Sequence, residues 1–190
     1  MLHTISKKFD FCYGHRVWSQ TLNAEYSEDT CLKCRHLHGH QGEIEVFLRP
    51  DLTESSDKLI NGMITDFKHL GWFKKWIDNV LDHKFIMDIN DPLINYEIYP
   101  FLSTKSLFTA HPEGYKTINL QGRDHDLTVP LVEKFEGMIF VDFIPTSENL
   151  SRWLAEIIDN KMAPIGVRCY GVKFNETPKS QSQVILHPFT

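Results

Sequence analysis

The order of apolar patterns along the chain restricts its fold more than any other feature. Two strand patterns precede the first helical pattern, and two follow the second. The strand patterns, in which apolar and polar residues alternate, cover 9–15, 41–48, 168–176 and 183–186. The first helical pattern begins at Phe67, with Thr65 or Asp66 as its N-terminal cap, and the second begins with Thr146 or Ser147 as its cap. Strands and helices that are segregated in this way predict an α+β fold, an antiparallel four-stranded sheet with two helices on one face.

The segment between the two helical patterns, 95–137, is the least regular part of the chain. Tyr96 to Leu102 is compatible with a short strand or an apolar loop, and Tyr115 to Leu120 alternates like a strand. The run 137–144 is typical of a buried strand. We therefore expect a single domain over 1–190 that carries an insertion at 95–137. The uncovered sheet face and its edges would then need a partner chain.

Composition narrows the class of protein. Of the 190 residues, 42% are hydrophobic and 24% are charged, which is ordinary for one soluble globular domain. The net charge of -5 disfavours a nucleic acid partner. No segment resembles a signal peptide or approaches the length of a membrane-spanning helix. The four cysteines do not suggest a disulfide framework, and together these features predict a reducing, cytoplasmic setting.

A stretch rich in metal-ligand residues, 31–40, leads directly into the second strand pattern. It holds two thiols and three imidazoles, Cys31, Cys34, His36, His38 and His40. In extended backbone His38 and His40 share one face, and His36 has the same parity. A closed site of Cys31, Cys34, His38 and His40 is a competing ligand set, and a redox Cys-x-x-Cys is a third possibility.

Residues outside this stretch are also candidates for a site. His15 ends the first strand pattern on the face of three aromatic side chains, either as a buried structural histidine or as a third metal ligand. Adjacent Asp82 and His83 follow the first helical pattern, where His83 could simply be favoured by the helix dipole. Alternation over 168–176 places Tyr170, Val172, Phe174 and Glu176 on one face, where Glu176 closes the apolar row as an exposed strand end or as an anchor. Glu148 follows a helix start and suits its positive end.

Several blocks occur in an order that resembles the 6-pyruvoyl-tetrahydropterin synthase / 6-carboxytetrahydropterin synthase family. The blocks are Phe11-x-x-x-His15, Cys34-x-x-x-His38-Gly-His40, Gly62-Met-Ile-Thr-Asp66-Phe, Leu81-Asp82-His83, Pro145-Thr-Ser-Glu-Asn149-Leu and the late Glu176. The resemblance implies the tunnelling (T-) fold, in which sheets join into a trimeric barrel and two trimers stack into a hexamer. The long segment 95–137 departs from the family pattern.

The resemblance also implies a role for each matching residue. His15, His38 and His40 correspond to three zinc ligands, which would leave zinc one open position for catalysis. Cys34 corresponds to the catalytic thiol, and Asp82 with His83 to its acid–base pair. The pterin-gripping carboxylate is matched by Glu176. Thr146 and Glu148 match a block that helps to form the pterin pocket.

The implied substrate is 7,8-dihydroneopterin triphosphate. A thiol four residues before the first histidine of His-x-His resembles the carboxy-forming branch, which releases triphosphate and acetaldehyde on the route to queuosine. The pyruvoyl-forming branch and a zinc-stabilised interaction module without turnover are the alternatives. Because the chain is acidic overall, the triphosphate needs a local basic patch, for which Arg16, Lys33, Arg35 and Lys84 are candidates.

Overall fold

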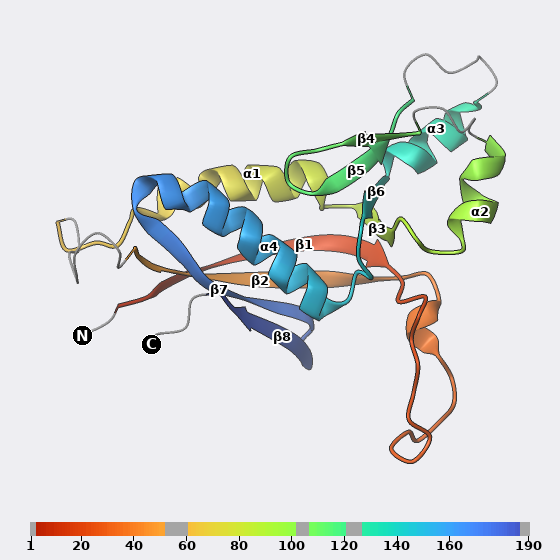
Figure 1. Cartoon of the computed structure of the whole chain (residues 1–190), viewed down its shortest axis with the longest axis horizontal. Helices are drawn as coiled ribbons and strands as arrows, with labels where there is room; N and C mark the ends of the chain where they lie inside the picture. Colours follow the sequence, from red (N-terminus) through yellow and green to blue (C-terminus); the bar gives the residue numbers. More distant parts are fainter. Residues whose placement is uncertain (1–2, 52–60, 102–106, 121–126, 187–190) are drawn as a thin grey trace. The chain divides into compact units, whose positions relative to one another are not determined.

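The computed structural model describes residues 3–51, 61–101, 107–120 and 127–186. The described chain holds eight strands: β1 (Ile5–His15), β2 (His38–Pro50), β3 (Lys84–Asp88), β4 (Phe108–Ala110), β5 (Tyr115–Ile118), β6 (Met138–Val141), β7 (Val167–Thr177) and β8 (Ser180–Ile185). Its helices are η1 (Lys33–Arg35), η3 (Phe67–Leu70), α1 (Gly71–Val80), α2 (Ile94–Glu97), η4 (Tyr99–Phe101), α3 (Val129–Glu136), α4 (Ser147–Met162) and η5 (Ala163–Ile165). Figure 1 shows these elements. No helix in this described part has the length and apolar character needed to cross a membrane.

The predicted α+β class is confirmed, but the predicted sheet of four antiparallel strands is wrong. The hydrogen-bonded order of the described strands is β4-β5-β6-β3-β1-β2-β7-β8. The β1–β3 and β3–β6 pairs are parallel, so the sheet is mixed. Strand β3 escaped prediction because it is a short apolar run without alternation, directly after a helix.

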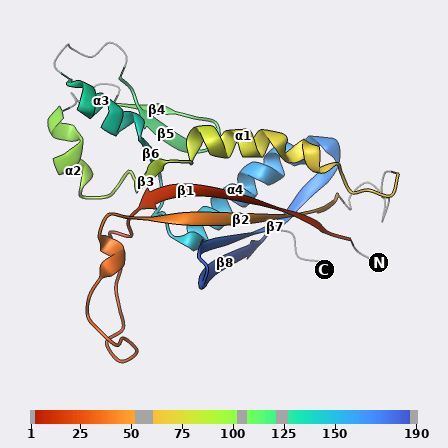
Figure 2. The ribbon, with the colours of Figure 1, turned by 180° about the vertical axis from the view of Figure 1, so that it is seen from behind.

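The described chain forms two compact units. The first unit takes its described residues from 1–11, 40–79 and 147–190, and the second from 12–39 and 80–146. In the first unit β7 pairs antiparallel with β2 and with β8, and α4 packs against β7 and β8 (Figure 1). Helix α1 runs along the first part of β1 (Figure 2). There the rings of Phe9 and Phe73 pack edge to face, with their centroids 5.1 Å apart. Asp66 caps the start of η3, as its position in the sequence predicts, through its contact with the Lys68 amide.

A β-bulge changes which residues of β7 face the core. The predicted face of Tyr170, Val172, Phe174 and Glu176 assumes unbroken alternation. The β2–β7 register shifts between Phe47 and Leu48, which pair with Gly171 and Cys169. Tyr170 is therefore only half-buried, whereas Val172 and Phe174 are fully buried. The extra residue reverses the parity of the strand, so this part of the prediction is corrected.

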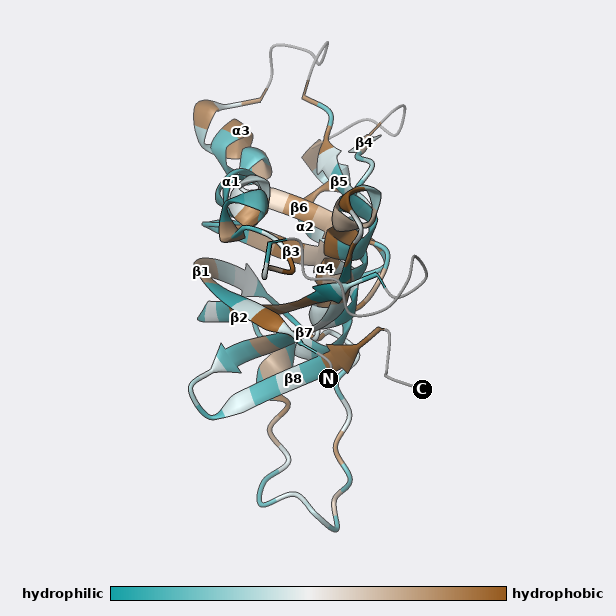
Figure 3. Cartoon of the chain, turned by 90° about the vertical axis from the view of Figure 1, so that its left-hand side faces the viewer, coloured by the Kyte–Doolittle hydropathy of each residue, from teal (hydrophilic) through white to brown (hydrophobic). Residues whose placement is uncertain are grey.

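The second unit contains the predicted insertion. Here β6 pairs with β3 and β5, and β5 pairs antiparallel with β4. Strand β6 is buried along its whole length and carries the apolar colouring of Figure 3. The described part of Tyr96 to Leu102 forms α2 and η4 rather than a strand or loop, because Ile94 and Ile98 lie four residues apart and are both buried. Residues 102–106 and 121–126 of the insertion lie outside the described chain.

Candidate metal centre

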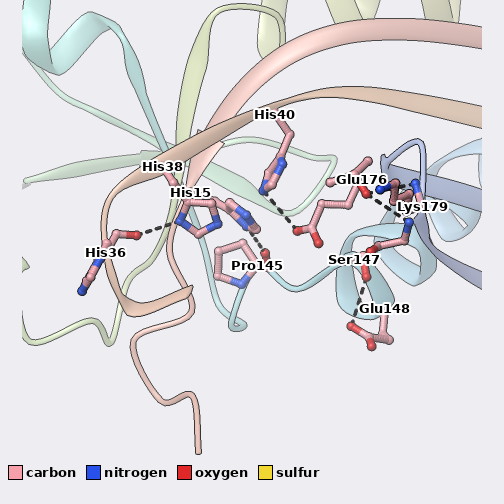
Figure 4. Close-up of polar contacts among 11 residues, drawn as sticks. His15, His36, His38, His40, Pro145, Ser147, Glu148, Glu176 and Lys179 are labelled. Carbon is pink, nitrogen blue, oxygen red and sulfur yellow. Dashed lines mark hydrogen bonds and ion pairs between the residues drawn. The ribbon is translucent and has the colours of Figure 1, made fainter. Parts of the chain in front are cut away.

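Three imidazoles lie close enough together to hold one metal ion. His15 ends β1, while His38 and His40 alternate along the start of β2. One ligand atom from each lies within 4.8 Å of the others (Figure 4). His15 is buried, and its ring lies 4.5 Å from that of His38. Extended backbone thus delivers all three side chains to one place, as the parity of the two strand patterns requires.

Two backbone carbonyls fix the tautomers of two of these rings. His15 donates from Nδ1 to the carbonyl oxygen of Pro145 at 2.6 Å, and His38 donates from Nδ1 to that of His36 at 2.7 Å. A carbonyl only accepts, so each Nδ1 carries the hydrogen and each Nε2 carries the lone pair. This is the usual arrangement of metal-binding histidines. Within this arrangement His36 contributes its carbonyl rather than its ring.

The donor set suits a catalytic zinc site. Neutral imidazole is a preferred zinc ligand, and three protein ligands leave a fourth position open. The metal-binding group found in the described chain contains neither Cys31 nor Cys34. The competing closed set of two thiols and two imidazoles is therefore not assembled in the described structure.

Glu176 lies beside the third imidazole. Its Oε1 is 3.6 Å from Nε2 of His40, and Figure 4 shows the carboxylate pointing toward that ring. The β7–β8 register shifts between Asn175 and Thr177, so Glu176 sits at an irregularity of the ladder. Such bulges often redirect a side chain beside a functional site. The carboxylate is half-buried, which keeps it accessible to a ligand.

Cys34 lies in the short helix η1, outside the histidine group. Its amide donates to Oε1 of Gln20 at 3.0 Å, and its carbonyl accepts from the amide of Val17 at 2.7 Å. The residue is half-buried, whereas Cys31 is exposed. These contacts connect the backbone of Cys34 to Val17 and Gln20, near the start of the long loop between β1 and β2.

The side chains of Asp82 and His83 lie close together just beyond the end of α1. Asp82 Oδ2 lies 3.0 Å from Nδ1 of His83, and its Oδ1 accepts from the amide of Cys12 at 2.8 Å. The amide of His83 donates back to the carbonyl of Cys12 at 2.7 Å. His83 has a φ of 59°, which is costly for a residue with a side chain. Strain of this kind is concentrated at functional sites, where surrounding contacts hold it in place.

An open hollow of about 580 Å³ lies beside this pair. It is lined by Cys12, Tyr13, Gly14, Leu37, His38, Gly39, His83, Lys84, Phe85 and Gly137. The hollow is therefore lined by both His83 and His38, a candidate metal ligand, but Cys34 and Glu176 are not among the described residues that line it. His38 is thus shared by the histidine group and by the hollow that His83 lines.

The two remaining candidates lie at the start of α4. Thr146 is half-buried and its amide donates to the carbonyl of Ile144 at 2.7 Å. Glu148 is exposed in the first turn, where the hydroxyl of Ser147 donates to its Oε2 at 3.3 Å. Thr146 follows Pro145, whose carbonyl accepts the hydrogen bond from His15. This hydrogen bond connects the segment before α4 to the histidine group.

Sequence reasoning missed two residues that support the site. Pro145 acts through a backbone carbonyl, which no side-chain pattern can reveal. Gln20 lies in a polar loop without periodicity, and its contact with Cys34 depends on how that loop folds. The sequence offered only one signal for Gln20: its side-chain amide can accept a hydrogen bond from a backbone N–H.

The chain is similar to known proteins over nearly its whole length. The family model described as 6-pyruvoyl tetrahydropterin synthase matches residues 4–185. A relative from Aquifex aeolicus, a 6-carboxy-5,6,7,8-tetrahydropterin synthase, is 30% identical over 170 residues, which cover 86% of this chain and 83% of the relative.

Solved structures extend the similarity. An uncharacterized protein, WS1659 from Wolinella succinogenes, has a TM-score of 0.88 and 45% identity, with 98% of this chain and 99% of that chain covered. The Caenorhabditis elegans 6-pyruvoyl tetrahydropterin synthase has a TM-score of 0.52 and 19% identity, with 98% of this chain and 97% of that chain covered. The second similarity supports the fold alone.

Proposed function

Because the chain belongs to the 6-pyruvoyl tetrahydropterin synthase family, we propose that it is a zinc-dependent 6-carboxy-5,6,7,8-tetrahydropterin synthase. The substrates would be 7,8-dihydroneopterin triphosphate and water, and the products 6-carboxytetrahydropterin, acetaldehyde and triphosphate. The observation that carries the proposal is the meeting of His15, His38 and His40 within 4.8 Å. The name of the Aquifex relative supports the carboxy-forming reaction.

The three imidazoles would hold zinc through nitrogen lone pairs that the carbonyl contacts of His15 and His38 leave on Nε2. When bound, zinc supplies Lewis-acid stabilisation of the charge that develops on the oxygens of the substrate side chain. The protein contributes a preset ligand geometry, because two of the rings are already oriented by backbone groups.

Cys34 and the Asp82–His83 pair would move protons. In this proposal the thiolate of Cys34 removes a proton from the substrate side chain, and His83 exchanges protons with the reacting oxygen. Asp82 lies 3.0 Å from Nδ1 of His83 and accepts from the amide of Cys12, so it would orient the imidazole and stabilise its charged form. His83 lines the open hollow, where a substrate can reach it.

Glu176 would hold the pterin ring. A carboxylate matches the two adjacent N–H donors of a 2-amino-pyrimidinone, and charge-assisted hydrogen bonds of this type are strong. Its distance of 3.6 Å from Nε2 of His40 supports a ring anchor next to the proposed zinc. Thr146 and Glu148, at the start of α4, would complete the pterin pocket.

The contacts of the basic residues narrow the choice of triphosphate ligands. Arg16 pairs at 3.0 Å with Asp91, whose side chain is completely buried, so its charge is already compensated. Lys33 is largely exposed at 3.8 Å from Asp29, and Lys84 lines the hollow. We propose Lys33, Arg35 and Lys84 as the groups that meet the triphosphate.

The biological setting is part of the same proposal. The product would feed the synthesis of 7-deazaguanines such as queuosine in the cytoplasm. The enzyme would assemble as a hexamer of two stacked trimers. Analytical ultracentrifugation of the zinc-loaded protein tests the assembly separately from the chemistry.

Incubation of the purified zinc-loaded protein with 7,8-dihydroneopterin triphosphate tests the function. We expect release of triphosphate, and mass spectrometry of the pterin product should give the 6-carboxy compound. Cys34→Ala should abolish release while zinc remains bound. A 6-pyruvoyl product would assign the other branch. Loss of zinc together with Cys34, and no turnover by the wild type, would instead favour a zinc-stabilised interaction module.

A further inference from the structure

The loop between β1 and β2 carries Cys34 but has little regular structure of its own. Over 16–37 its only helical element in the described chain is η1, of three residues. A loop with so little regular structure keeps a catalytic group in place only if other contacts anchor it. The side chains that anchor this loop are therefore candidates for positioning the thiol.

Two buried carboxylates anchor the base of this loop. The indole N–H of Trp18 donates to Oδ2 of Asp88 at 2.9 Å, and Arg16 pairs with Oδ2 of Asp91 at 3.0 Å. Asp88 is 3% exposed and Asp91 is 2% exposed. Buried carboxylates are costly unless they are paired or hydrogen-bonded, so each contact offsets part of the cost of burying its carboxylate.

The second oxygen of each carboxylate holds the turn that follows β3. Asp88 Oδ1 accepts from the amide of Asn90 at 2.9 Å, and Asp91 Oδ1 accepts from the amide of Leu93 at 2.8 Å. That turn leads into α2, with which the insertion begins. One pair of carboxylates thus fixes both the Cys34 loop and the entry to the insertion.

A second set of contacts connects the anchored base of the loop to the backbone of Cys34. The amide of Val17, next to Trp18, donates to the carbonyl of Cys34 at 2.7 Å. The side-chain oxygen of Gln20 accepts from the amide of Cys34 at 3.0 Å, and its backbone oxygen accepts from Nε of Arg35 at 3.0 Å. Both backbone groups of Cys34 are therefore held by residues within the anchored base (Val17) or just after it (Gln20).

We propose that Trp18, Asp88 and Gln20 are positioning residues for Cys34. Trp18 and Asp88 fix the base of the loop, and Gln20 fixes the backbone of the thiol residue. The catalytic part of this proposal rests on the proposed function, in which Cys34 transfers a proton. Small displacements of such a group reduce the rate of chemistry more than they weaken substrate binding.

Gln20 permits a matched test in the zinc-loaded, full-length protein. Gln20→Met keeps the length of the side chain but removes the acceptor, whereas Gln20→Glu keeps an acceptor oxygen. We expect Gln20→Met to lower kcat by about fivefold, the usual effect of one net hydrogen bond, with KM within about twofold. Gln20→Glu should keep the kcat of the wild type, and the zinc content of both variants should equal that of the wild type.

Trp18→Phe tests the base of the loop, with Trp72→Phe as the control for the loss of an indole N–H. The N–H of Trp72 has no hydrogen-bond partner in the described structure. We expect Trp18→Phe to lower kcat in the same way and Trp72→Phe to leave it unchanged.

A second measurement is the rate at which iodoacetamide alkylates Cys34, followed by peptide mass spectrometry. This rate should rise about fivefold in Gln20→Met and Trp18→Phe.

The alkylation rate separates this proposal from the proposed function. If the wild type shows no turnover, the proposed function fails, while a changed alkylation rate still supports positioning of the thiol. Wild-type alkylation rates in both Gln20→Met and Trp18→Phe would overturn the positioning role. A fall in kcat that parallels loss of zinc would also overturn it, because the residues would then support the metal centre.

Discussion

His15 gives its Nδ1 hydrogen to the carbonyl oxygen of Pro145, over a distance of 2.6 Å and 130 residues of chain. The contact joins the end of β1 to the segment between β6 and α4. The Nε2 lone pair of His15 is therefore directed by a carbonyl of the loop between β6 and α4. The ligand geometry is thus a consequence of the fold and does not have to be created by the metal.

The first prediction concerns the histidines at the start of β2. His38→Gln should lower zinc affinity by more than about 100-fold, because loss of a ligand exceeds the effect of losing a supporting contact. His36→Gln should leave zinc affinity unchanged, because His36 contributes a carbonyl that any residue supplies. Zinc titration against a chromophoric chelator measures both. Loss of zinc from His36→Gln would mean that its ring is a ligand.

The second prediction concerns Gly39, which stands between the proposed zinc ligands His38 and His40. A Cβ at this position would lie 2.9 Å from the carbonyl oxygen of Tyr13, closer than such contacts allow. Gly39→Ala should destabilise the protein by about 1–3 kcal/mol and weaken zinc binding, because β2 must move away from β1.

Gly71→Ala is the matched control for this change. Gly71 has helical backbone angles, and a Cβ added there would meet no neighbouring atom within 4 Å, so alanine should stabilise the protein by about 0.4–1 kcal/mol. Thermal unfolding with and without zinc gives both values. Equal effects of the two substitutions would contradict the proposed close approach at Gly39.

The third prediction concerns the pH dependence of stability. The hydrogen bond from Lys8 lowers the pKa of Glu43 from its ordinary value of 4.5, and Asn175 contributes a further hydrogen bond. A lowered folded-state pKa stabilises the fold above the unfolded pKa, and this contribution is lost as pH falls through the folded value. Glu43→Gln should therefore cost less than about 1 kcal/mol at pH 7, because the pair is solvent-exposed.

Urea unfolding of the wild type and of Glu43→Gln, from pH 7 down to pH 2.5, measures this difference. The two stabilities should converge below the ordinary pKa of a glutamate. A gap that stays constant down to pH 2.5 would show that the substitution acts through packing rather than through charge.

The fourth prediction concerns Cys169, which lies in β7 and is fully buried. Burial raises the pKa of this thiol to about 12, so it stays protonated and inert in the folded protein at pH 8. Iodoacetamide at pH 8 should label exposed Cys31 rapidly and leave Cys169 unlabelled until urea is added. Peptide mass spectrometry distinguishes the two, and rapid labelling of Cys169 in the folded state would contradict its burial.

The sequence predicts those features that depend on local periodicity. The strand parity of β1 and β2 places His15, His38 and His40 on faces that can converge, and the family blocks assign their roles. The α+β class follows from the same patterns. Helices α1 and α4 lie where the apolar spacing predicts them, because each needs one buried stripe against the sheet.

Features that depend on tertiary pairing escape prediction. Strand β3 has five residues and no alternation, so only its parallel neighbours β1 and β6 define it as a strand. The bulge at Tyr170 reverses the parity of β7 through the register of β2, which the sequence of β7 does not contain. The anchoring of Trp18 by Asp88 likewise joins residues 70 positions apart.

The last prediction separates two roles of Glu176. If Glu176 holds the pterin ring, Glu176→Gln should raise KM by about 10-fold to 100-fold, because one acceptor becomes a donor that faces the donors of the ring. Zinc content should not change, and Glu156→Gln, an exposed carboxylate on α4, should behave as the wild type. Steady-state kinetics and zinc analysis of the same preparations decide the matter. Because Glu176 lies 3.6 Å from His40, loss of zinc with an unchanged KM would instead make it a support for the metal ligand.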